Sequence, residues 1–227
     1  MKWMLLALAL IGMGLWAAVH FSLVKIPPNW APWGAVELDE EPAWFARMQI
    51  NSLTSDPAAC YGALENSSIE YRRLDDRPIV DGCGLEAGAE ILKSQIAYSS
   101  GFRATCGITA ALYWYERRLD ALALEHLGSK IRRIQHLGTY SCRNIGGGAR
   151  RSQHATANAI DLAGFTLADG TTVSVLRDWG GDDGKGRFLL AARDEACRFF
   201  NTVLGPDYNQ AHADHFHLDL GRARICR

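Results

Sequence analysis

The chain has 227 residues, which is enough for one domain of ordinary size and an additional segment. Its composition is that of a globular protein, with 48% hydrophobic residues, 22% charged residues and a formal net charge of -1 at pH 7. The lack of a basic excess argues against a nucleic-acid-binding protein, and the sequence contains no internal repeat or low-complexity tract.

An uncharged, apolar segment runs from Trp3 to Val24 and is long enough to cross a hydrocarbon core of about 30 Å. A helix buried in a soluble core is a poor alternative, because the segment is apolar on every side. A cleaved signal peptide is another alternative, but bulky Trp16 and Phe21 surround the alanine pair where a cleavage motif would lie. We therefore expect residues 1–24 to be an uncleaved transmembrane signal anchor, single-pass in the inner membrane, with the domain in the periplasm.

Six cysteines are spread along the chain without a CxxC pair. A structural cysteine–zinc site is not expected, because a zinc ribbon needs close pairs. In an exported chain an even number of separated cysteines predicts three disulfides, whose connectivity the sequence leaves open. Six buried free thiols would fit only a cytosolic chain. We expect Cys197 to pair with Cys226, and Cys106 with Cys142.

Residues 25–54 contain several prolines and tryptophans and little glycine, a composition typical of a semi-extended linker. The sequence Ser55-Asp56-Pro57 is typical of a helix start, so we expect the folded domain to occupy residues 55–227. The linker tryptophans either rest at the membrane surface or pack on the domain; they are Trp30, Trp33 and Trp44.

Two helices are predicted in the domain. Apolar residues at helical spacing indicate the first over residues 106–127, and Gly128 marks its end. The second is predicted over residues 188–204, closed by Gly205-Pro206. The segment 85–97 fits either a short helix or a strand.

Strand patterns occupy much of the remaining domain. Residues 131–137 and 215–220 have strand-like patterns, and residues 159–166 and 171–176 flank Ala168-Asp169-Gly170, a hairpin turn signal. Together the elements predict an α+β fold, with a small antiparallel sheet and helices to one side.

Three histidines are concentrated near the C-terminus, in His212-Ala-Asp214-His215-Phe-His217. Imidazole is the commonest metal ligand and also moves protons near neutral pH. Alternate residues of a strand project from the same face, so His215 and His217 would point to one place. One can then bind a metal ion while the other contacts water or substrate. A pair of exposed sheet histidines is the alternative reading.

A second cluster, Ser152-Gln-His154-Ala-Thr-Ala-Asn-Ala-Ile-Asp161, supplies a histidine and a carboxylate. Alone, this spacing fits a loop histidine and a strand-end aspartate equally well. Combined with one histidine of the downstream pair, His154 and Asp161 predict a His/His/Asp zinc site. Three protein ligands leave the fourth position for water, which is the catalytic pattern, and a neighbouring base would then move the proton.

The motif Ser152-x-His154-(x6)-Asp161 with His215-x-His217 resembles the peptidases of the lysostaphin, D-Ala-D-Ala metallopeptidase and hedgehog superfamily. The spacing His212-x-x-His215-x-His217 is similar to that of penicillin-insensitive murein endopeptidase. The segments Thr105-Cys106-Gly, His136 to Asn144 and Ser152 to Asp161 resemble more closely the bacterial extensin-like C-terminal domain family. This resemblance covers roughly residues 55–227 and implies a hedgehog/D-Ala-D-Ala peptidase-like fold.

The resemblance also implies roles by position. His154, Asp161 and His217 match the zinc ligands. His215 matches the base or oxyanion stabiliser, and His212 an accessory active-site histidine. The dipeptidase branch has a longer Glu at the position of Asp214, so this residue either acts as the base or orients an imidazole; the base stays open between Asp214 and His215.

Substrate contacts are expected beside the glycine-rich loop. Ser152 matches a substrate-contacting serine, although capping a turn explains it equally well. Arg143, Arg150 and Arg151 flank the loop and can bind a substrate carboxylate through paired donors. Solvated loop charges are the alternative for each arginine.

These observations predict a membrane-tethered zinc peptidase that acts on peptidoglycan peptides or their cross-links. The substrate class follows from the resemblance and the compartment, not from residue spacing. The main alternative is a non-catalytic zinc-containing module that binds the cell wall or a protein. A zinc amidase acting on a small amide is a third reading.

Overall fold

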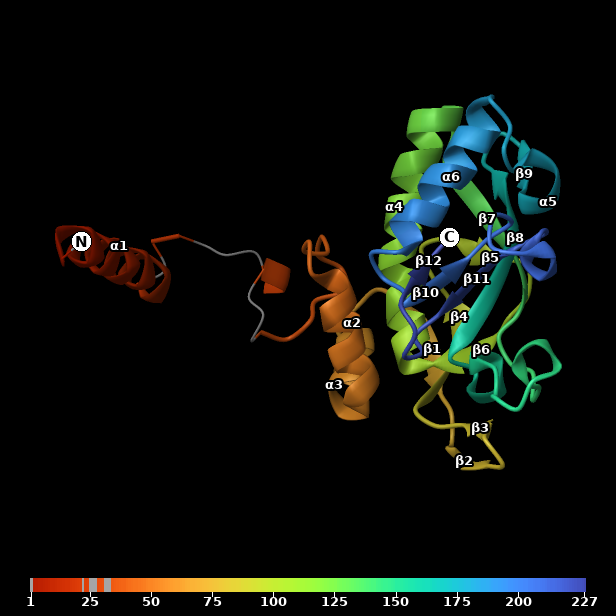
Figure 1. Ribbon diagram of the computed structural model, residues 1–227, viewed down its shortest axis with the longest axis horizontal. Coiled ribbons are helices and arrows are strands. Elements are labelled where there is room, and N and C mark those ends of the chain that lie inside the picture. The colour runs from red at the N-terminus through yellow and green to blue at the C-terminus, as the bar shows by residue number, and fades with distance from the viewer. Residues whose placement is uncertain (1, 22, 25–27, 31–33) are drawn as a thin grey trace.

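The computed structural model describes residues 2–21, 23–24, 28–30 and 34–227. Trp33 of the predicted linker lies outside the described residues. Figure 1 labels the helices α1 (Lys2–His20), α2 (Ala46–Ser55), α3 (Pro57–Glu65), α4 (Cys106–Leu127), α5 (Val175–Asp178) and α6 (Gly184–Ala196). Short 3-10 turns are η1 (Pro28–Trp30), η2 (Ile145–Gly147), η3 (Gln153–Thr156) and η4 (Gln210–His212). The strands are β1 (Glu70–Arg73), β2 (Arg77–Val80), β3 (Cys83–Leu85), β4 (Gly88–Lys93), β5 (Ala97–Tyr98), β6 (Arg103–Thr105), β7 (Ile131–Gly138), β8 (Ala159–Leu167), β9 (Thr172–Ser174), β10 (Thr202–Leu204), β11 (Phe216–Asp219) and β12 (Ile225–Cys226).

The main sheet of the described chain has seven strands in the order β12-β10-β11-β8-β7-β5, with β9 paired to β8. Most neighbours are antiparallel, but β5 pairs with β7 and β12 with β10 in parallel. Two smaller sheets, β1-β4-β6 and β2-β3, accompany it. The α+β class is confirmed, whereas the prediction of a small antiparallel sheet is wrong. The main sheet is larger and mixed, because β5 and β12 add a parallel strand at each of its two edges.

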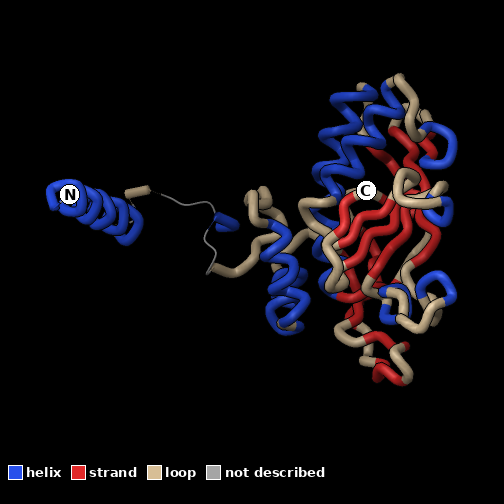
Figure 2. Tube along the Cα trace, in the orientation of Figure 1, coloured by secondary structure: helices blue, strands red, loops and turns tan. Residues whose placement is uncertain are grey.

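Helices α4 and α6 lie side by side on one face of this sheet (Figures 1 and 2). The helix predicted over residues 106–127 is confirmed with the same bounds. The Thr105 side chain caps its first turn by accepting from the Ile108 amide. Gly128 ends the helix in the left-handed conformation, with φ of 70°, which glycine adopts without a Cβ clash. Tyr115 of α4 packs edge-to-face against the ring of Phe200, with 5.9 Å between the ring centroids.

The predicted hairpin is confirmed as β8 and β9, and the segments 131–137 and 215–220 form β7 and β11. The segment 85–97, for which helix and strand were both open, consists mainly of β4 and contains no helix. The helix predicted over residues 188–204 is wrong at both ends. It begins at Gly184, because Asp183 caps it, and it ends at Ala196 because the following chain enters the sheet as β10, buried between β11 and β12.

Part of the predicted linker is folded with the domain. Residues 46–55 form α2, and its side chains Ile50 and Leu53 are buried in the core. The exposed tryptophan before it, Trp44, keeps 78% of its surface accessible. The predicted helix start is confirmed: Asp56 accepts bonds from two amides of the first turn of α3.

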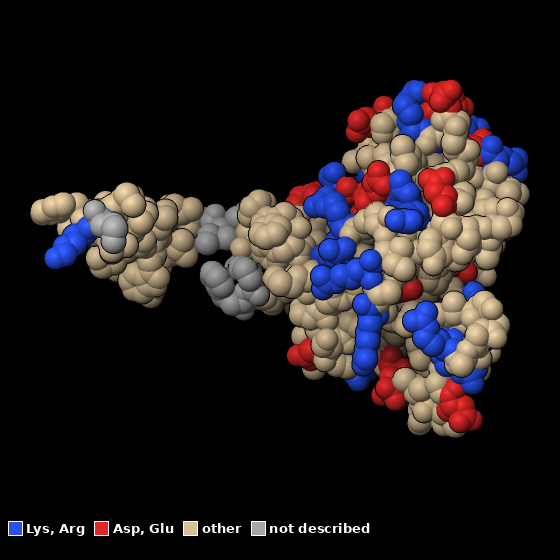
Figure 3. All heavy atoms as spheres, in the orientation of Figure 1, with Lys and Arg blue, Asp and Glu red and all other residues tan. Residues whose placement is uncertain are grey.

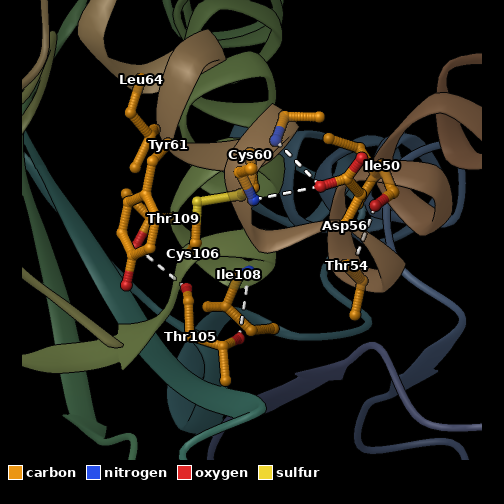
Figure 4. Close-up of a disulfide and its surroundings, with 12 residues drawn as sticks. Ile50, Thr54, Asp56, Cys60, Tyr61, Leu64, Thr105, Cys106, Ile108 and Thr109 are labelled. Atoms are coloured by element: carbon orange, nitrogen blue, oxygen red, sulfur yellow. Dashed lines mark hydrogen bonds between the residues drawn. A yellow bond between two sulfur atoms is a disulfide. The ribbon is translucent and has the colours of Figure 1, made fainter. Parts of the chain in front are cut away.

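Three disulfides are present and join Cys60 to Cys106, Cys83 to Cys142, and Cys197 to Cys226. The predicted Cys197–Cys226 pair is confirmed. The predicted Cys106–Cys142 pair is wrong, because Cys106 begins α4 where α3 crosses it, and its sulfur therefore meets Cys60 (Figure 4). The partner of Cys142 is Cys83 in the β2–β3 hairpin.

The N-terminal helix α1 stands apart from the domain (Figure 1), and none of its residues is buried. It is long and apolar enough to cross a membrane, and a signal sequence would pass the same test. As signal or anchor, this helix together with the disulfides indicates an extracytoplasmic domain.

A buried carboxylate makes the stability of the fold depend on pH. Glu116 of α4 is 1% exposed and accepts hydrogen bonds from the Tyr98 and Ser94 hydroxyls and the Ile96 amide. Burial raises the pKa of Glu116 from 4.5 to about 7, despite these hydrogen bonds, which lower it. The folded protein therefore binds this proton more tightly than the unfolded chain does.

We expect the resulting stability to be fully present below pH 4.5 and to be lost as the pH rises through about 7. Glu116→Gln removes the titration, so at pH 8 the variant should be more stable than the wild type by up to about 3 kcal/mol. Urea unfolding at pH 4.5 and 8 measures this difference. Glu125→Gln changes an exposed glutamate of the same helix and should shift neither value. A pH-independent difference for Glu116→Gln would contradict the assignment.

Candidate metal centre

Asp161 and His217 are brought together by strand pairing. They are directly opposite residues of the antiparallel pair β8 and β11. Their neighbours Ile160 and Leu218 belong to the core cluster, so the alternation of a strand turns Asp161 and His217 to the other face of the sheet. His217 Nδ1 lies 3.0 Å from Asp161 Oδ1.

A β-bulge keeps Asp161 on this face. In the pairing of β7 with β8, Gln135 is opposite Gly164 but His136 is opposite Leu162, so Ala163 is an extra residue. The core-facing side chains of β8 consequently change from Ile160 and Leu162 to Phe165 and Leu167. Because of the bulge, Asp161 near one end of β8 faces away from the core, while Phe165 near the other end faces into it.

His154 reaches the same point from η3. Ser152 caps this turn by accepting from the His154 amide, and the imidazole is 3% exposed. Its Nδ1 lies 3.0 Å from the Thr139 carbonyl oxygen, which places the proton on Nδ1 and leaves Nε2 free as a ligand. Nε2 is 3.1 Å from both Asp161 Oδ1 and His217 Nδ1.

The three facing atoms fit a small tetrahedral ion. His154 Nε2, His217 Nδ1 and Asp161 Oδ1 form a triangle with sides of 3.0 to 3.1 Å. Ligand atoms around tetrahedral zinc are about 3.3 Å apart when each is about 2.0–2.1 Å from the ion. A slight widening of the triangle would therefore admit zinc. We call these residues the metal triad; they are a buried group that could hold a metal ion, whose identity the donors alone do not specify.

The charges of the metal triad are strongly coupled. Burial lowers the pKa of His217, but hydrogen bonds to Asp161 and Asp219 outweigh burial and raise it to about 9. Burial raises the pKa of Asp161, but its interactions with the His154 and His217 rings outweigh burial and hold it well below its usual range. In the absence of a metal ion His217 is therefore a protonated ring between two carboxylates, and a metal ion would replace that proton.

The remaining residues of the C-terminal motif surround the metal triad. His215 Nε2 lies 3.6 Å from Asp161 Oδ1, and its Nδ1 is 2.7 Å from Asp214 Oδ1. The His212 ring centroid is 5.3 Å from that of His215, and its Nδ1 contacts Asn209 Oδ1. Burial, followed by the neighbouring charges of His215 and His217, lowers the pKa of His212 to about 4, so His212 is neutral at pH 7.

The predicted substrate-contacting residues line a cleft of about 1630 Å³ that opens over His212, His215 and His217. Ser152 lies at its wall and is engaged in capping η3. Arg151 uses Nε and Nη1 to hold the Asp81 carbonyl and Asn144, so only part of its guanidinium is free. Arg143 and Arg150 are exposed in the same wall. His154 and Asp161 lie beneath the floor of the cleft.

The whole constellation lies within a stretch that matches one family model. Residues 58–227 match the model described as "Extensin-like protein C-terminus". The chain belongs to this family. No curated protein and no solved structure matched the chain. The family match covers every residue of the metal triad and Arg143, Arg150 and Arg151, but not α1 or α2 of this extensin-like protein.

Two residues that orient the ligands escaped the sequence reasoning. Asp219 Oδ2 lies 2.9 Å from His217 Nε2 and fixes the ring that faces Asp161. The sequence does contain a signal for Asp219: it follows His217 by two residues on one strand, and residues at this spacing lie on the same face. The Thr139 carbonyl, which fixes the His154 ring, has no side-chain signal at all.

We expect Asp219→Asn to weaken metal binding about 10- to 100-fold, because an amide orients the His217 ring less strongly and lowers its basicity. Competition with a chromophoric chelator measures the affinity. The control Asp207→Asn changes an exposed carboxylate outside the metal centre and should leave affinity unchanged. Equal affinities for Asp219→Asn and the wild type would exclude an orienting role.

Proposed function

We propose that this extensin-like protein is a zinc-dependent peptidase that acts on peptidoglycan peptides or their cross-links. The observation that carries the proposal is the metal triad, whose three facing atoms lie beneath an open cleft. A closed structural zinc site would need a fourth protein ligand. Within the described residues, the group that could hold a metal ion consists of His154, Asp161 and His217, which supports an open rather than a closed site. The relation to D-Ala-D-Ala metallopeptidases is part of this proposal.

Zinc at the metal triad would supply Lewis-acid activation of a peptide carbonyl and of water. The Asp214–His215 pair supplies the proton transfers. His215 Nε2 faces the metal triad while Nδ1 is held by Asp214, so His215 takes the proton of the attacking water and returns it to the leaving amine. Asp214 orients the ring and stabilises its charged form. This geometry favours His215 over Asp214 as the base.

His212 and the cleft arginines complete the proposed site. Neutral His212 stands beside His215 and His217 and can hydrogen-bond to the tetrahedral intermediate as an accessory group. Arg143 lines the same cleft as His212, and its charge contributes to the lowered pKa of His212, which supports a role for Arg143 in binding a substrate carboxylate. Ser152 and Arg151 also line the cleft.

The proposed location is the inner membrane, with α1 as an uncleaved single-pass anchor and the domain in the periplasm. The disulfides and the apolar helix support a compartment outside the cytoplasm. Peptidoglycan lies in that compartment in bacteria that possess an inner membrane, which is why its peptides are the proposed substrate.

Digestion of purified muropeptides by the zinc-loaded full chain, with mass spectrometry of the products, tests the proposal. We expect new peptide fragments, their disappearance in excess chelator, and their return when zinc is restored. Fragments that persist unchanged in the chelator would argue against metal-dependent hydrolysis. An inactive protein that binds zinc and cosediments with intact sacculi would instead support the non-catalytic wall-binding module.

A further inference from the structure

The cleft over the metal triad is far more basic than the protein as a whole. The chain has 24 Lys and Arg against 25 Asp and Glu. Seven arginines line the cleft, and Asp219 is the only acidic residue among the described residues of its lining. Asp219 is occupied by His217 and by the Gly221 amide, so it neutralises little of this charge. The surface is thus complementary to an anionic partner.

Four of these arginines lie outside the loop wall already described. We name Arg47 of α2, Arg198 after α6, and Arg222 and Arg224 between β11 and β12 the basic arm of the cleft. Figure 3 shows basic side chains gathered beside the C-terminal strands on the face in view. Arg198 pairs with Glu195, and Arg47 donates to the Cys197 carbonyl. Within the described residues, no ion pair involves Arg222 or Arg224, and both are exposed.

The basic arm is connected directly to the metal triad. The chain passes from His217 to Arg222 in five residues, so their Cα atoms are at most about 18 Å apart. Asp219 joins the two, because one carboxylate oxygen holds His217 and the other holds the Gly221 amide of the Arg222 turn. An extended peptide rises about 3.3 Å per residue, so about five residues would reach from the metal triad to this turn.

The uncharged part of the lining suits a peptide chain. Asn51, Asn158, Asn201 and Gln153 border the cleft with uncharged polar side chains. Asn51 pairs with Asn201, and Asn158 donates to Gln153, so this wall is held in place before a peptide binds. Exposed Trp44 and Met48 supply apolar surface at its α2 end. The smaller cleft, of about 570 Å³, differs because its arginines are accompanied by Glu90.

We propose that the basic arm binds an extended peptide with several free carboxylates, whose backbone continues to the metal triad. The arginines pair with the carboxylates. This proposal deepens the proposed function by naming the acidic character of the substrate and a second binding region remote from the reacting bond. The binding itself requires neither metal nor turnover.

Fluorescence anisotropy of labelled hexaglutamate with the full chain in neutral detergent, in the presence of chelator, tests the proposal. We expect hexaglutamate to bind, with an affinity that falls as salt is added, and hexaglutamine to bind at least about tenfold more weakly. The double variant Arg222→Gln/Arg224→Gln should weaken hexaglutamate binding about tenfold. Arg222→Lys/Arg224→Lys keeps the charge and should retain most of the binding.

The matched control is Arg132→Gln/Arg133→Gln, which removes the same charge from two exposed arginines of β7 outside the cleft. It should change hexaglutamate binding by less than about twofold. If both double variants lost hexaglutamate binding equally, the loss would follow from the change in net charge and not from the basic arm, and the proposal would be overturned. Binding of tripolyphosphate without binding of hexaglutamate would overturn it in favour of a phosphate polymer. If hexaglutamate binds as expected but the protein never hydrolyses muropeptides, the proposed peptidase activity is refuted and the proposal for the basic arm is not.

Discussion

Replacing His217 with alanine is expected to abolish stoichiometric metal binding and all hydrolysis that depends on it. The variant loses one of the three facing atoms of the metal triad and leaves Asp161 and Asp219 without their shared partner. Zinc sites with four protein ligands bind with about 10–16 kcal/mol, or roughly 2.5–4 kcal/mol per ligand, so the affinity should fall by on the order of a hundredfold or more. Metal content after gel filtration and chelator competition measure the loss.

The matched variant is His215→Ala, which removes a histidine two residues away that we place beside the ion rather than on it. It should retain the metal content of the wild type while its turnover falls about 10²- to 10⁴-fold, the usual contribution of a positioned base. His136→Ala, a histidine in β7 outside the metal triad, should affect neither readout. Full peptidase activity in both His217→Ala and His215→Ala would show that the site is wrongly assigned.

Removal of the Cys60–Cys106 disulfide is expected to cause the largest loss of stability among the three bridges. Both cysteines are buried, at 0% and 1% exposure, and they join α3 to the first turn of α4 (Figure 4). The sequence separation of 46 residues corresponds to about 4 kcal/mol of loop-closure entropy in the chain-entropy description. The double variant Cys60→Ala/Cys106→Ala should also lose packing in the core, which adds about 1–2 kcal/mol.

Cys83→Ala/Cys142→Ala provides the control. Its separation of 59 residues gives a similar loop term, but neither cysteine belongs to the buried core. Urea unfolding followed by far-UV circular dichroism at pH 7 should therefore show a smaller loss for this pair. If the Cys60–Cys106 pair lost less stability than the Cys83–Cys142 pair, core packing around Cys60 and Cys106 would not contribute as the structure indicates.

Short-range patterns determined the elements whose signals are adjacent in sequence. The bounds of α4 follow from the Thr105 cap and Gly128, each of which acts on its own helix end. The β8–β9 hairpin follows from its turn residues. Residue chemistry and the two-residue period of a strand, which are local properties, selected His154, Asp161 and one histidine of the pair His215 and His217 as candidate ligands. The choice of His217 within that pair came from the family resemblance.

Long-range pairing decided the features that no short window contains. The apolar pattern of the preceding helix was extended through Thr202–Leu204, but these residues form β10, because pairing with β11 and β12 buries them in the sheet. The pairing of Cys60 with Cys106 follows from the packing of α3 on α4.

The details of the metal centre were decided in the same way. The exact opposition of Asp161 and His217 depends on the register of β8 with β11, and the His154 tautomer depends on a backbone carbonyl in another segment. The sequence by itself therefore determined which groups can carry the chemistry. Only the tertiary structure decided their distances, their protonation and their access to the cleft, because these depend on contacts between segments far apart in the chain.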